Sequence, residues 1–487
     1  MNRRFFLKSC LWGSAALGLS TNAFLCRRVK KRPNFLFILV DDLGWRDLGC
    51  YGSSFYETPH VDQLALHGMR FTNAYAACPV CSPTRVSVMT GKYPARLQTT
   101  DYFGAPQPET VADHWTRYKP LLPAPYKEHM PLDEVTVAEA LKKAGYATFF
   151  AGKWHMGGKG FYPENQGYDV NKGGWERGGP YGGKKYFSPY GNPKLEDGPE
   201  GEHLPDRLAS ETCQFIESHQ DENFLAFLSF YSVHTPLIAR EDLREKYRKK
   251  KGNKEKIWGK EGDRKVRLVQ NHAVYGGMVE AMDLAVGKII NQLKTLGLYE
   301  NTVIIFMSDN GGLSTSEGHP TSNLPLRAGK GWLYEGGIRE PMIIRWPGMT
   351  QPGTQSSEPV MSTDFYPTML QMAGLPLLPN QHLDGKSLVP LLKKGSQIQE
   401  RCLFWHYPHY GNQGGSPGSA LRCGKYKLIE FFEDNHIELY DLSQDIGERK
   451  NLSKKIPEKA AELKEKLHSW RENVGALMPT PNPNAKN

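Results

Sequence analysis

Continuous apolar runs that end abruptly in polar residues recur along this chain. Such runs are typical of strands buried on both faces of a parallel sheet, and four occur, over 35–40, 146–151, 224–231 and 303–307. Between them lies a short helical pattern that opens at Thr136, where Glu139 completes a capping-box spacing, and closes at Gly145. A longer amphipathic helix is predicted over 268–296. This alternation predicts an α/β fold with a large, mostly parallel central sheet flanked by helices.

Each predicted strand is followed by side chains that can carry chemistry. In open α/β sheets, ligands bind beyond the carboxyl ends of the strands. The residues found there, in chain order, are Asp41 and Asp42, then Lys153 and His155, then His234, and finally Asp309 and Asn310. Because four strands end in this way, the sequence predicts a functional site at this edge of the sheet.

The pattern changes beyond about residue 386. A polar turn near Asp434 separates 422–431 from 437–442, which predicts a β-hairpin, and an amphipathic helix is expected over 457–474. We therefore expect a catalytic domain over 33–385 and a smaller C-terminal subdomain, an antiparallel sheet plus a helix, over 386–478. The Pro- and Asn-rich end, 479–487, is predicted to be a flexible tail.

The N-terminus accounts for most of the net charge of +9. Residues 1–32 hold eight Lys and Arg and no acidic residue, so the remainder carries about +1. The string R-R-F-F-L-K at 3–8 matches the twin-arginine export pattern, and the alternative is a general secretory signal. Both predict export to a bacterial periplasm or the medium, with 1–32 as signal and linker. No later apolar run is long enough to cross a bilayer, and no nucleic-acid-binding motif is present.

A second basic stretch covers residues 240–267. The simpler interpretation is a solvated surface insertion, and the alternative is a patch that attracts a polyanionic substrate. The chain has eight cysteines, too few for a disulfide scaffold at this length, and their pairing cannot be read from their spacing.

The acidic residues at the strand ends indicate a metal site. Asp41, Asp42, Asp309 and Asn310 supply only oxygen donors, which suit calcium or magnesium rather than zinc. Each pair alone is also explained by an ordinary turn. Two adjacent carboxylates at a buried strand end, however, repel each other unless a cation neutralises them.

The segment C-P-V-C-S-P-T-R at 78–85 contains the candidate nucleophile. Pro83 is suited to the first position of a helix, which would place Cys81 just before the helix N-terminus, with Arg85 one turn on. These features favour an activated thiolate. The alternatives are a structural cysteine or a disulfide between Cys78 and Cys81.

The same segment resembles the C-x-P-x-R signature of type I sulfatases, arylsulfatase-like members of the alkaline phosphatase superfamily. Other blocks follow in the family's order: V-D-D-L-G at 40–44, G-K-W-H at 152–155, V-H-T-P at 233–236, S-D-N-G-G at 308–312 and G-K-G-W-L-Y-E-G-G-I-R-E-P at 329–341. The resemblance implies an alkaline-phosphatase-like fold. It also implies that a formylglycine-generating (sulfatase-maturating) enzyme oxidises Cys81 to Cα-formylglycine.

The resemblance further implies the roles of individual residues. Asp41, Asp42, Asp309 and Asn310 would hold one calcium, preferred over magnesium, with the modified Cys81 completing its shell. The residues expected around the aldehyde hydrate and the sulfate are Arg85, Lys153, His155, His234 and Lys330. Of these, His155 is expected to take a proton when sulfate leaves, and His234, with Lys330, to protonate the leaving alcohol.

The expected substrate is a sulfated saccharide or polysaccharide. His319 and Arg327 are predicted to reach it, and the aromatic segment 404–410 is expected either to shape a sugar pocket or to belong to the core. Three other functions remain open at this stage: a formylglycine-dependent phosphonate or phosphodiester hydrolase, a non-catalytic binder of sulfated glycans with Cys81 as a thiol, and a plain cysteine hydrolase.

Overall fold

A nine-stranded sheet forms the centre of the protein in the computed structural model, which describes residues 32–393 and 398–486. Its order is β11-β2-β10-β9-β1-β6-β4-β5, with β12 also paired to β2. Only β10 runs antiparallel to its neighbours. The strands are β1 (Asn34–Val40), β2 (Met69–Tyr75), β4 (Ala147–Gly152), β5 (Val170–Lys172), β6 (Phe224–Ser229), β9 (Thr302–Ser308), β10 (Arg339–Arg345), β11 (Thr354–Ser356) and β12 (Val360–Met361). The predicted fold class and all four predicted strands are confirmed.

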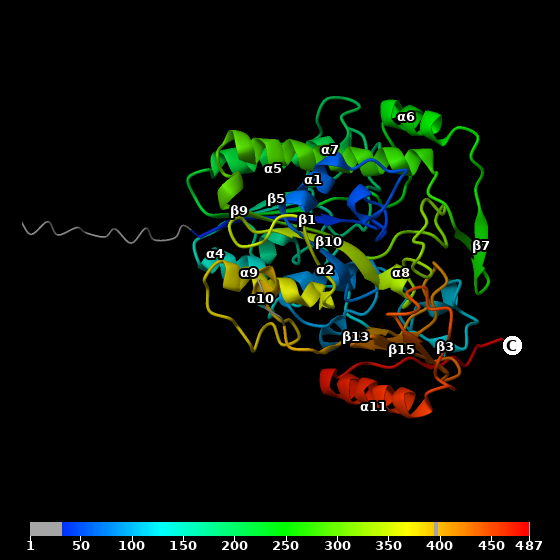
Figure 1. The fold of residues 1–487 in the computed structure, drawn as a ribbon. Helices are drawn as coiled ribbons and strands as arrows, with labels where there is room; N and C mark the ends of the chain where they lie inside the picture. The colour runs from blue at the N-terminus through cyan, green and yellow to red at the C-terminus, as the bar shows by residue number, and fades with distance from the viewer. Residues whose placement is uncertain (1–31, 394–397, 487) are drawn as a thin grey trace, which may run out of the picture. The chain divides into compact units, whose positions relative to one another are not determined.

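Helices cover both faces of this sheet, as Figure 1 shows. Alternate residues of β1 point to opposite sides: Leu36 and Ile38 join one apolar core and Phe35 and Phe37 the other. The first core contains α1 (Pro59–His67), α5 (Leu204–Ser218) and α7 (Ala273–Thr295), and the second contains α2 (Cys81–Thr90), α4 (Val137–Lys143), α9 (Phe365–Met372) and α10 (Val389–Leu392). Burial on both sides explains why β1 reads as a continuous apolar run.

One of these helices begins as predicted, and the starts of two others need adjustment. The capping box at the start of α4 is present, with Thr136 and Glu139 bonded reciprocally. Helix α7 begins at Ala273 rather than at 268, because the side chain of His272 caps it there. Helix α2 begins at Cys81, so Cys81 lies in its first turn and Pro83 is its third residue.

The C-terminal part contains a four-stranded antiparallel sheet, β13 (Cys402–Tyr407), β14 (Gly418–Cys423), β15 (Tyr426–Phe431) and β16 (Ile437–Asp441), with α11 (Pro457–Val474) packed on it. The predicted strand over 422–431 is in fact two strands. Gly424 adopts a positive φ and makes a tight turn between β14 and β15. Cys402 and Cys423, directly opposite each other on β13 and β14, form a disulfide.

The chain end is packed rather than frayed, which differs from the prediction. β17 (Thr480–Pro481) pairs with β3 (Leu121–Leu122), and the buried Asn482 donates to the carbonyls of Arg117 and Lys119. These backbone partners lie far away in sequence and carry no local signal. From Arg32 onward the described residues form one compact unit.

The remaining α-helices are α3 (Pro94–Leu97), α6 (Glu241–Lys251) and α8 (Glu335–Ile338), and β7 (Trp258–Glu261) pairs with β8 (Arg264–Arg267) in a hairpin. Within the described ranges, no helix combines the length and hydrophobicity that a bilayer crossing requires. Of the predicted export signal and linker, 1–32, residues 1–31 lie outside the part of the chain that the structure describes.

Candidate active site

The four strands that end in polar residues are neighbours in the sheet, in the order β9-β1-β6-β4. They run parallel and in register, so their carboxyl ends meet at one edge. The residues that follow them are all buried there: Asp41, Asp42, Lys153, His155, His234, Asp309 and Asn310. The structure therefore brings together all the strand-end residues that the sequence singled out.

Three oxygen atoms at this edge are buried without a hydrogen-bond partner among the described residues: Asp41 Oδ1, Asp42 Oδ2 and Asn310 Oδ1. The amide of Asn310 donates to Asp42 Oδ1 over 2.7 Å, so its own oxygen is free to bind a cation. Asp41, Asp42 and His234 also place potential ligand atoms within 4.8 Å of one another. Unpaired buried oxygens are costly, and a hard cation such as calcium or magnesium would satisfy all three. The residues fit such an ion.

Three cationic side chains surround these carboxylates. Lys153 Nζ lies 2.7 Å from Asp41 Oδ2, and Lys330 Nζ lies 2.6 Å from Asp42 Oδ1. Burial raises the pKa of Asp41 well above its usual range, with Lys153 opposing the shift. Burial acts in the same direction on Asp42, but Lys330, His234 and Lys153 together outweigh it and lower that pKa to about 2. Together with Arg85 and Asp309, the cluster contains three cationic side chains and three carboxyl groups.

Arg85 is the most extensively bonded of these cations. Its Nε and one terminal nitrogen donate to Asp309 Oδ2 over 2.8 and 2.6 Å. Its other terminal nitrogen donates to the carbonyl of Lys153 and to Ser229 Oγ. The guanidinium is buried, and a planar fork of this kind fits a carboxylate better than a lysine does. Arg85 thus connects α2 to the ends of β9, β4 and β6.

Cys81 and His155 face each other, with Cys81 Sγ 3.4 Å from His155 Nδ1. His155 Nε2 lies 3.1 Å from the carbonyl oxygen of Phe103, which can only accept, so the proton is on Nε2. Burial, with Lys153 nearby, holds the pKa of His155 well below its usual value, so the ring is neutral. Nδ1 therefore presents a lone pair to the side chain at position 81.

His234 has the opposite arrangement. Its Nδ1 donates to the carbonyl of Thr235 over 2.7 Å, which leaves Nε2 directed towards the cluster, 3.8 Å from Asp42 Oδ2. Burial and the nearby Lys330 hold its pKa well below the usual value. A bound anion would raise that pKa, because negative charge favours the imidazolium.

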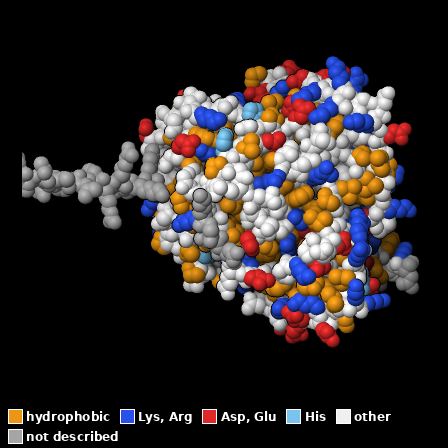
Figure 2. Space-filling model, viewed as in Figure 1, with side chains coloured by type: hydrophobic (Ala, Val, Ile, Leu, Met, Phe, Trp, Pro, Cys, Tyr) orange, Lys and Arg blue, Asp and Glu red, His pale blue; other side chains and the backbone are white. Residues whose placement is uncertain are grey.

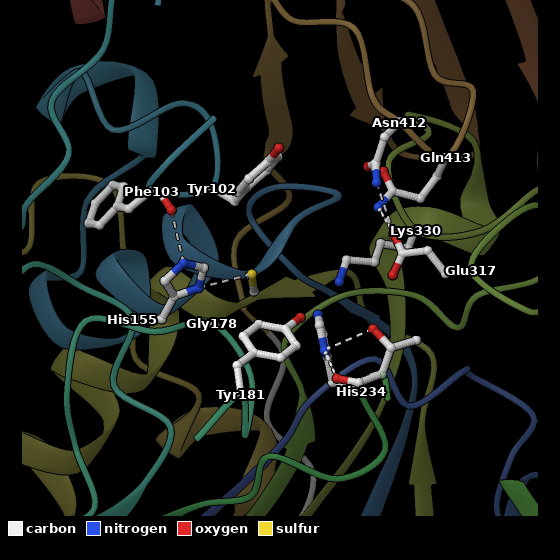
Figure 3. A pocket seen from close by; sticks show the side chains of 12 residues that line it. Tyr102, Phe103, His155, Gly178, Tyr181, His234, Glu317, Lys330, Asn412 and Gln413 are labelled. Atoms are coloured by element: carbon white, nitrogen blue, oxygen red, sulfur yellow. Dashed lines mark hydrogen bonds between the residues drawn. The ribbon is translucent and has the colours of Figure 1, made fainter. Parts of the chain in front are cut away.

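These residues open into a cavity of about 420 Å³, shown in Figure 3. Cys81, His155, His234 and Lys330 line it, whereas Asp41, Asp42 and Asp309 are fully buried and do not line it. The cavity also has lining residues that the sequence did not indicate: Tyr102, Phe103, Gly178, Tyr181, Thr235, Glu317, Asn412 and Gln413. Most belong to irregular loops, where hydrophobic periodicity gives no signal.

Two predicted substrate contacts lie outside this cavity. Arg327 forms an ion pair with Glu261 at 2.7 Å and lies over the ring of Tyr334, so its charge is already used. His319 packs edge-on against Trp258. Neither residue lines the cavity.

The aromatic segment 404–410 belongs mainly to the core. Trp405 and Tyr407 on β13 are almost fully buried, and Trp405 Nε1 donates to the carbonyl of Ala76. The segment thus joins the C-terminal sheet to the rest of the protein. The C-terminal residues that do reach the cavity, Asn412 and Gln413, come from the loop that follows.

Comparison with known proteins identifies the family. The sulfatase family profile matches residues 33–375, and the C-terminal profile of N-sulphoglucosamine sulphohydrolase matches residues 328–473. A sulfatase of Formosa agariphila is 32% identical, covering 96% of this chain and 93% of that protein. Human arylsulfatase A is 31% identical, covering 87% and 84%. The crystal structure of Ps i-CgsB has a TM-score of 0.75 at 28% identity, covering 93% and 95%. The chain belongs to the sulfatase family, in the alkaline phosphatase superfamily, and is a sulfuric ester hydrolase.

Proposed function

We propose that this protein removes sulfate from a sulfated saccharide, using a formylglycine made from Cys81 and one calcium ion. The observation that carries the proposal is the position of Cys81 on the cavity wall, where it faces His155 and shares the wall with Lys330, the ion-pair partner of Asp42. An unmodified thiol would not need the buried oxygen atoms suited to a metal ion, nor the three cationic side chains of the cluster. The family signature C-S-P-T-R at 81–85 supports the conversion.

A hydrated formylglycine at position 81 would supply one hydroxyl that attacks sulfur and a second whose deprotonation expels sulfate and restores the aldehyde. His155 suits the second event, because its unprotonated Nδ1 already faces this side chain. Its fixed tautomer, set by the carbonyl of Phe103, keeps that nitrogen ready to accept a proton.

Calcium would be held by the oxygens of Asp41, Asp42, Asp309 and Asn310 and would lower the pKa of the attacking hydroxyl. The charge balance supports a divalent ion here. Three carboxylates already match three cations, so an added divalent cation leaves a net positive cluster that suits an anionic sulfate ester.

Protonation of the leaving alcohol is assigned to His234, with Lys330. Both line the cavity, and the free Nε2 of His234 is directed towards the cluster. The bound sulfate ester is itself the anion that would raise the pKa of His234 and let it carry the proton.

A saccharide substrate is favoured by the rest of the cavity. Tyr102, Phe103 and Tyr181 offer aromatic faces, and Glu317 offers a carboxylate oxygen positioned by Gln413, which donates to it over 2.7 Å. Sugar rings present apolar faces and hydroxyl donors, which match these groups. Ps i-CgsB, 28% identical, has been solved in complex with k-i-k-neocarrahexaose.

Export to the periplasm or the medium is part of the proposal. The Cys402–Cys423 disulfide is typical of an oxidising compartment, and the R-R-F-F-L-K string supports the twin-arginine route. The host would need a sulfatase-maturating enzyme to convert Cys81.

The competing function is hydrolysis of phosphonate or phosphate diesters. The phosphonate monoester hydrolase of Agrobacterium radiobacter shares the fold at a TM-score of 0.62 and 22% identity. The test compares kcat/KM for 4-nitrophenyl sulfate with kcat/KM for the phenylphosphonate monoester and the bis-ester of phosphate, in wild type and in Cys81→Ala. We expect the sulfate to be preferred and the alanine variant to be inactive. Preference for either phosphorus ester would refute the proposal.

A further inference from the structure

The basic segment 240–267 is not explained by the catalytic site. It holds thirteen Lys and Arg against six Asp and Glu, a net charge of +7, whereas residues 33–487 as a whole carry about +1. Figure 2 shows Lys and Arg side chains gathered along the edge that carries α6 and β7. The molecule therefore concentrates positive charge on one segment and is negative elsewhere.

Many of these charges have no acidic partner. Six lysines of the segment form no salt bridge within the described part of the chain: Lys249, Lys251, Lys254, Lys256, Lys260 and Lys265. The arginines and the other lysines of α6 are different, since Lys246 and Lys250 both pair with Glu57. The unpaired charge thus runs from the last turn of α6, which holds Lys249 and Lys251, along the approach to the β7–β8 hairpin and onto the hairpin itself.

The hairpin places two of these lysines directly opposite each other. Lys260 on β7 is the cross-strand partner of Lys265 on β8, and both are exposed. Like charges at such a position destabilise a sheet unless an anion lies between them. Trp258 shares the same face, and Lys265 Nζ lies 5.2 Å from its ring centre. This face combines an aromatic surface with two ammonium groups.

The hairpin packs against both loops that form the outer wall of the cavity. Arg267 donates to the carbonyls of Ser314 and His319, which flank the cavity residue Glu317. On the other side, Arg264 packs on Gly414, the residue after Gln413, so closely that an added Cβ would lie 2.6 Å from its Cγ. A chain that leaves the cavity past these loops reaches the hairpin next.

We propose that the β7–β8 hairpin binds sulfate groups on sugars next to the one in the cavity, so that the substrate is a polysulfated chain. Lys260 and Lys265 contact a sulfate group, and Trp258 packs against a sugar ring. The proposal rests on the sulfatase function proposed above. It adds a binding surface outside the cavity and a preference for polymers over monosaccharides.

The test uses the double variant K260A/K265A, with K454A/K455A as its matched control. Lys454 and Lys455 are also exposed, and they form no salt bridge among the described residues. The dissociation constant for dextran sulfate is measured at low salt, with unsulfated dextran as the reference polymer. We expect the hairpin variant to bind about tenfold more weakly and with a smaller salt dependence, and the control to bind like wild type.

Thermal unfolding separates a binding role from a structural one. Since Lys260 and Lys265 repel each other, K260A/K265A is expected to unfold at the same temperature as wild type or higher. K260Q/K265Q, which keeps the length of the side chains, should show the same loss of binding. Equal affinity of wild type and both hairpin variants for dextran sulfate would overturn the proposal, as would equally tight binding of duplex DNA. Binding is measured without turnover, so this outcome is independent of whether wild type hydrolyses 4-nitrophenyl sulfate.

Discussion

Replacing Arg85 with lysine tests the buried ion-pair network beneath the cavity. The guanidinium makes two bonds to Asp309 Oδ2, one to the carbonyl of Lys153 and one to Ser229 Oγ, all between 2.6 and 2.8 Å. A lysine ammonium at the same place reaches one of these partners, and the others lose a charged donor. Breaking a buried pair of this kind costs about 3–5 kcal/mol of unfolding free energy. Because Asp309 and Lys153 also shift, kcat is expected to fall at least about 100-fold.

The assay is urea unfolding followed by tryptophan fluorescence, together with kcat on 4-nitrophenyl sulfate. Arg117→Lys is the matched control, because Arg117 is exposed and does not line the cavity. We expect its unfolding free energy to change by less than about 0.5 kcal/mol and its activity to be unaltered. If Arg85→Lys lowers the unfolding free energy by less than about 1 kcal/mol and keeps wild-type kcat, Arg85 does not hold α2 to the ends of β9, β4 and β6.

Four further predictions follow from the site and the core. His155→Ala should lower kcat by about 10²–10⁴ and let sulfated enzyme accumulate, seen as added mass on the peptide containing Cys81; an unchanged kcat would remove His155 from the mechanism. His234→Ala should reduce turnover of alkyl sulfates far more than of aryl sulfates, whose leaving groups need no acid, and equal losses would exclude it as that acid. Chelation of divalent cations should lower the unfolding temperature, and added calcium should restore it. At a calcium concentration 100 times its dissociation constant, the unfolding free energy should rise by about 2.7 kcal/mol, and an unchanged unfolding temperature would argue against a bound cation. Burial lowers the pKa of His203 to about 3, so the neutral imidazole does not reduce the unfolding free energy above pH 6.5. As the pH falls from 6.5 towards 3, His203 is protonated in the unfolded chain before it is protonated in the folded one, and the unfolding free energy decreases by about 2 kcal/mol at pH 5. His203→Phe should remove this part of the pH dependence of the unfolding free energy.

The strand ends could be predicted because burial on both faces leaves a strong sequence signal. Asp41 and Asp309 follow continuous apolar runs, and parallel strands must bring such residues to one edge. The sequence did not specify that β9, β1, β6 and β4 are neighbours, but the agreement of four strand ends made a shared site the simplest interpretation.

The outer wall of the cavity could not be predicted in this way. Glu317 lies in a loop with positive φ, and Gln413 reaches the cavity from a loop of the C-terminal part. Both positions depend on tertiary contacts between segments about 100 residues apart, such as the bond between these two side chains. For Arg327 the sequence suggested a substrate contact that the structure does not contain. Its position near Lys330 led to that prediction, but its side chain forms an ion pair with Glu261 of the hairpin.

The polar turn signals near the C-terminus gave the correct class of structure but the wrong strand boundaries. Gly424 turns the chain between Cys423 and Tyr426, so that one predicted strand becomes two. Composition alone does not locate such a turn inside a run that is otherwise rich in strand-forming residues.

The central claim is that the nucleophile is made from Cys81. It is tested most directly by mass spectrometry of the tryptic peptide over residues 71–85, from active protein produced in a host with a maturating enzyme. We predict that residue 81 carries an aldehyde and that the aldehyde fraction rises in proportion to sulfatase activity. A fully active preparation in which residue 81 is an unmodified thiol would contradict the mechanism.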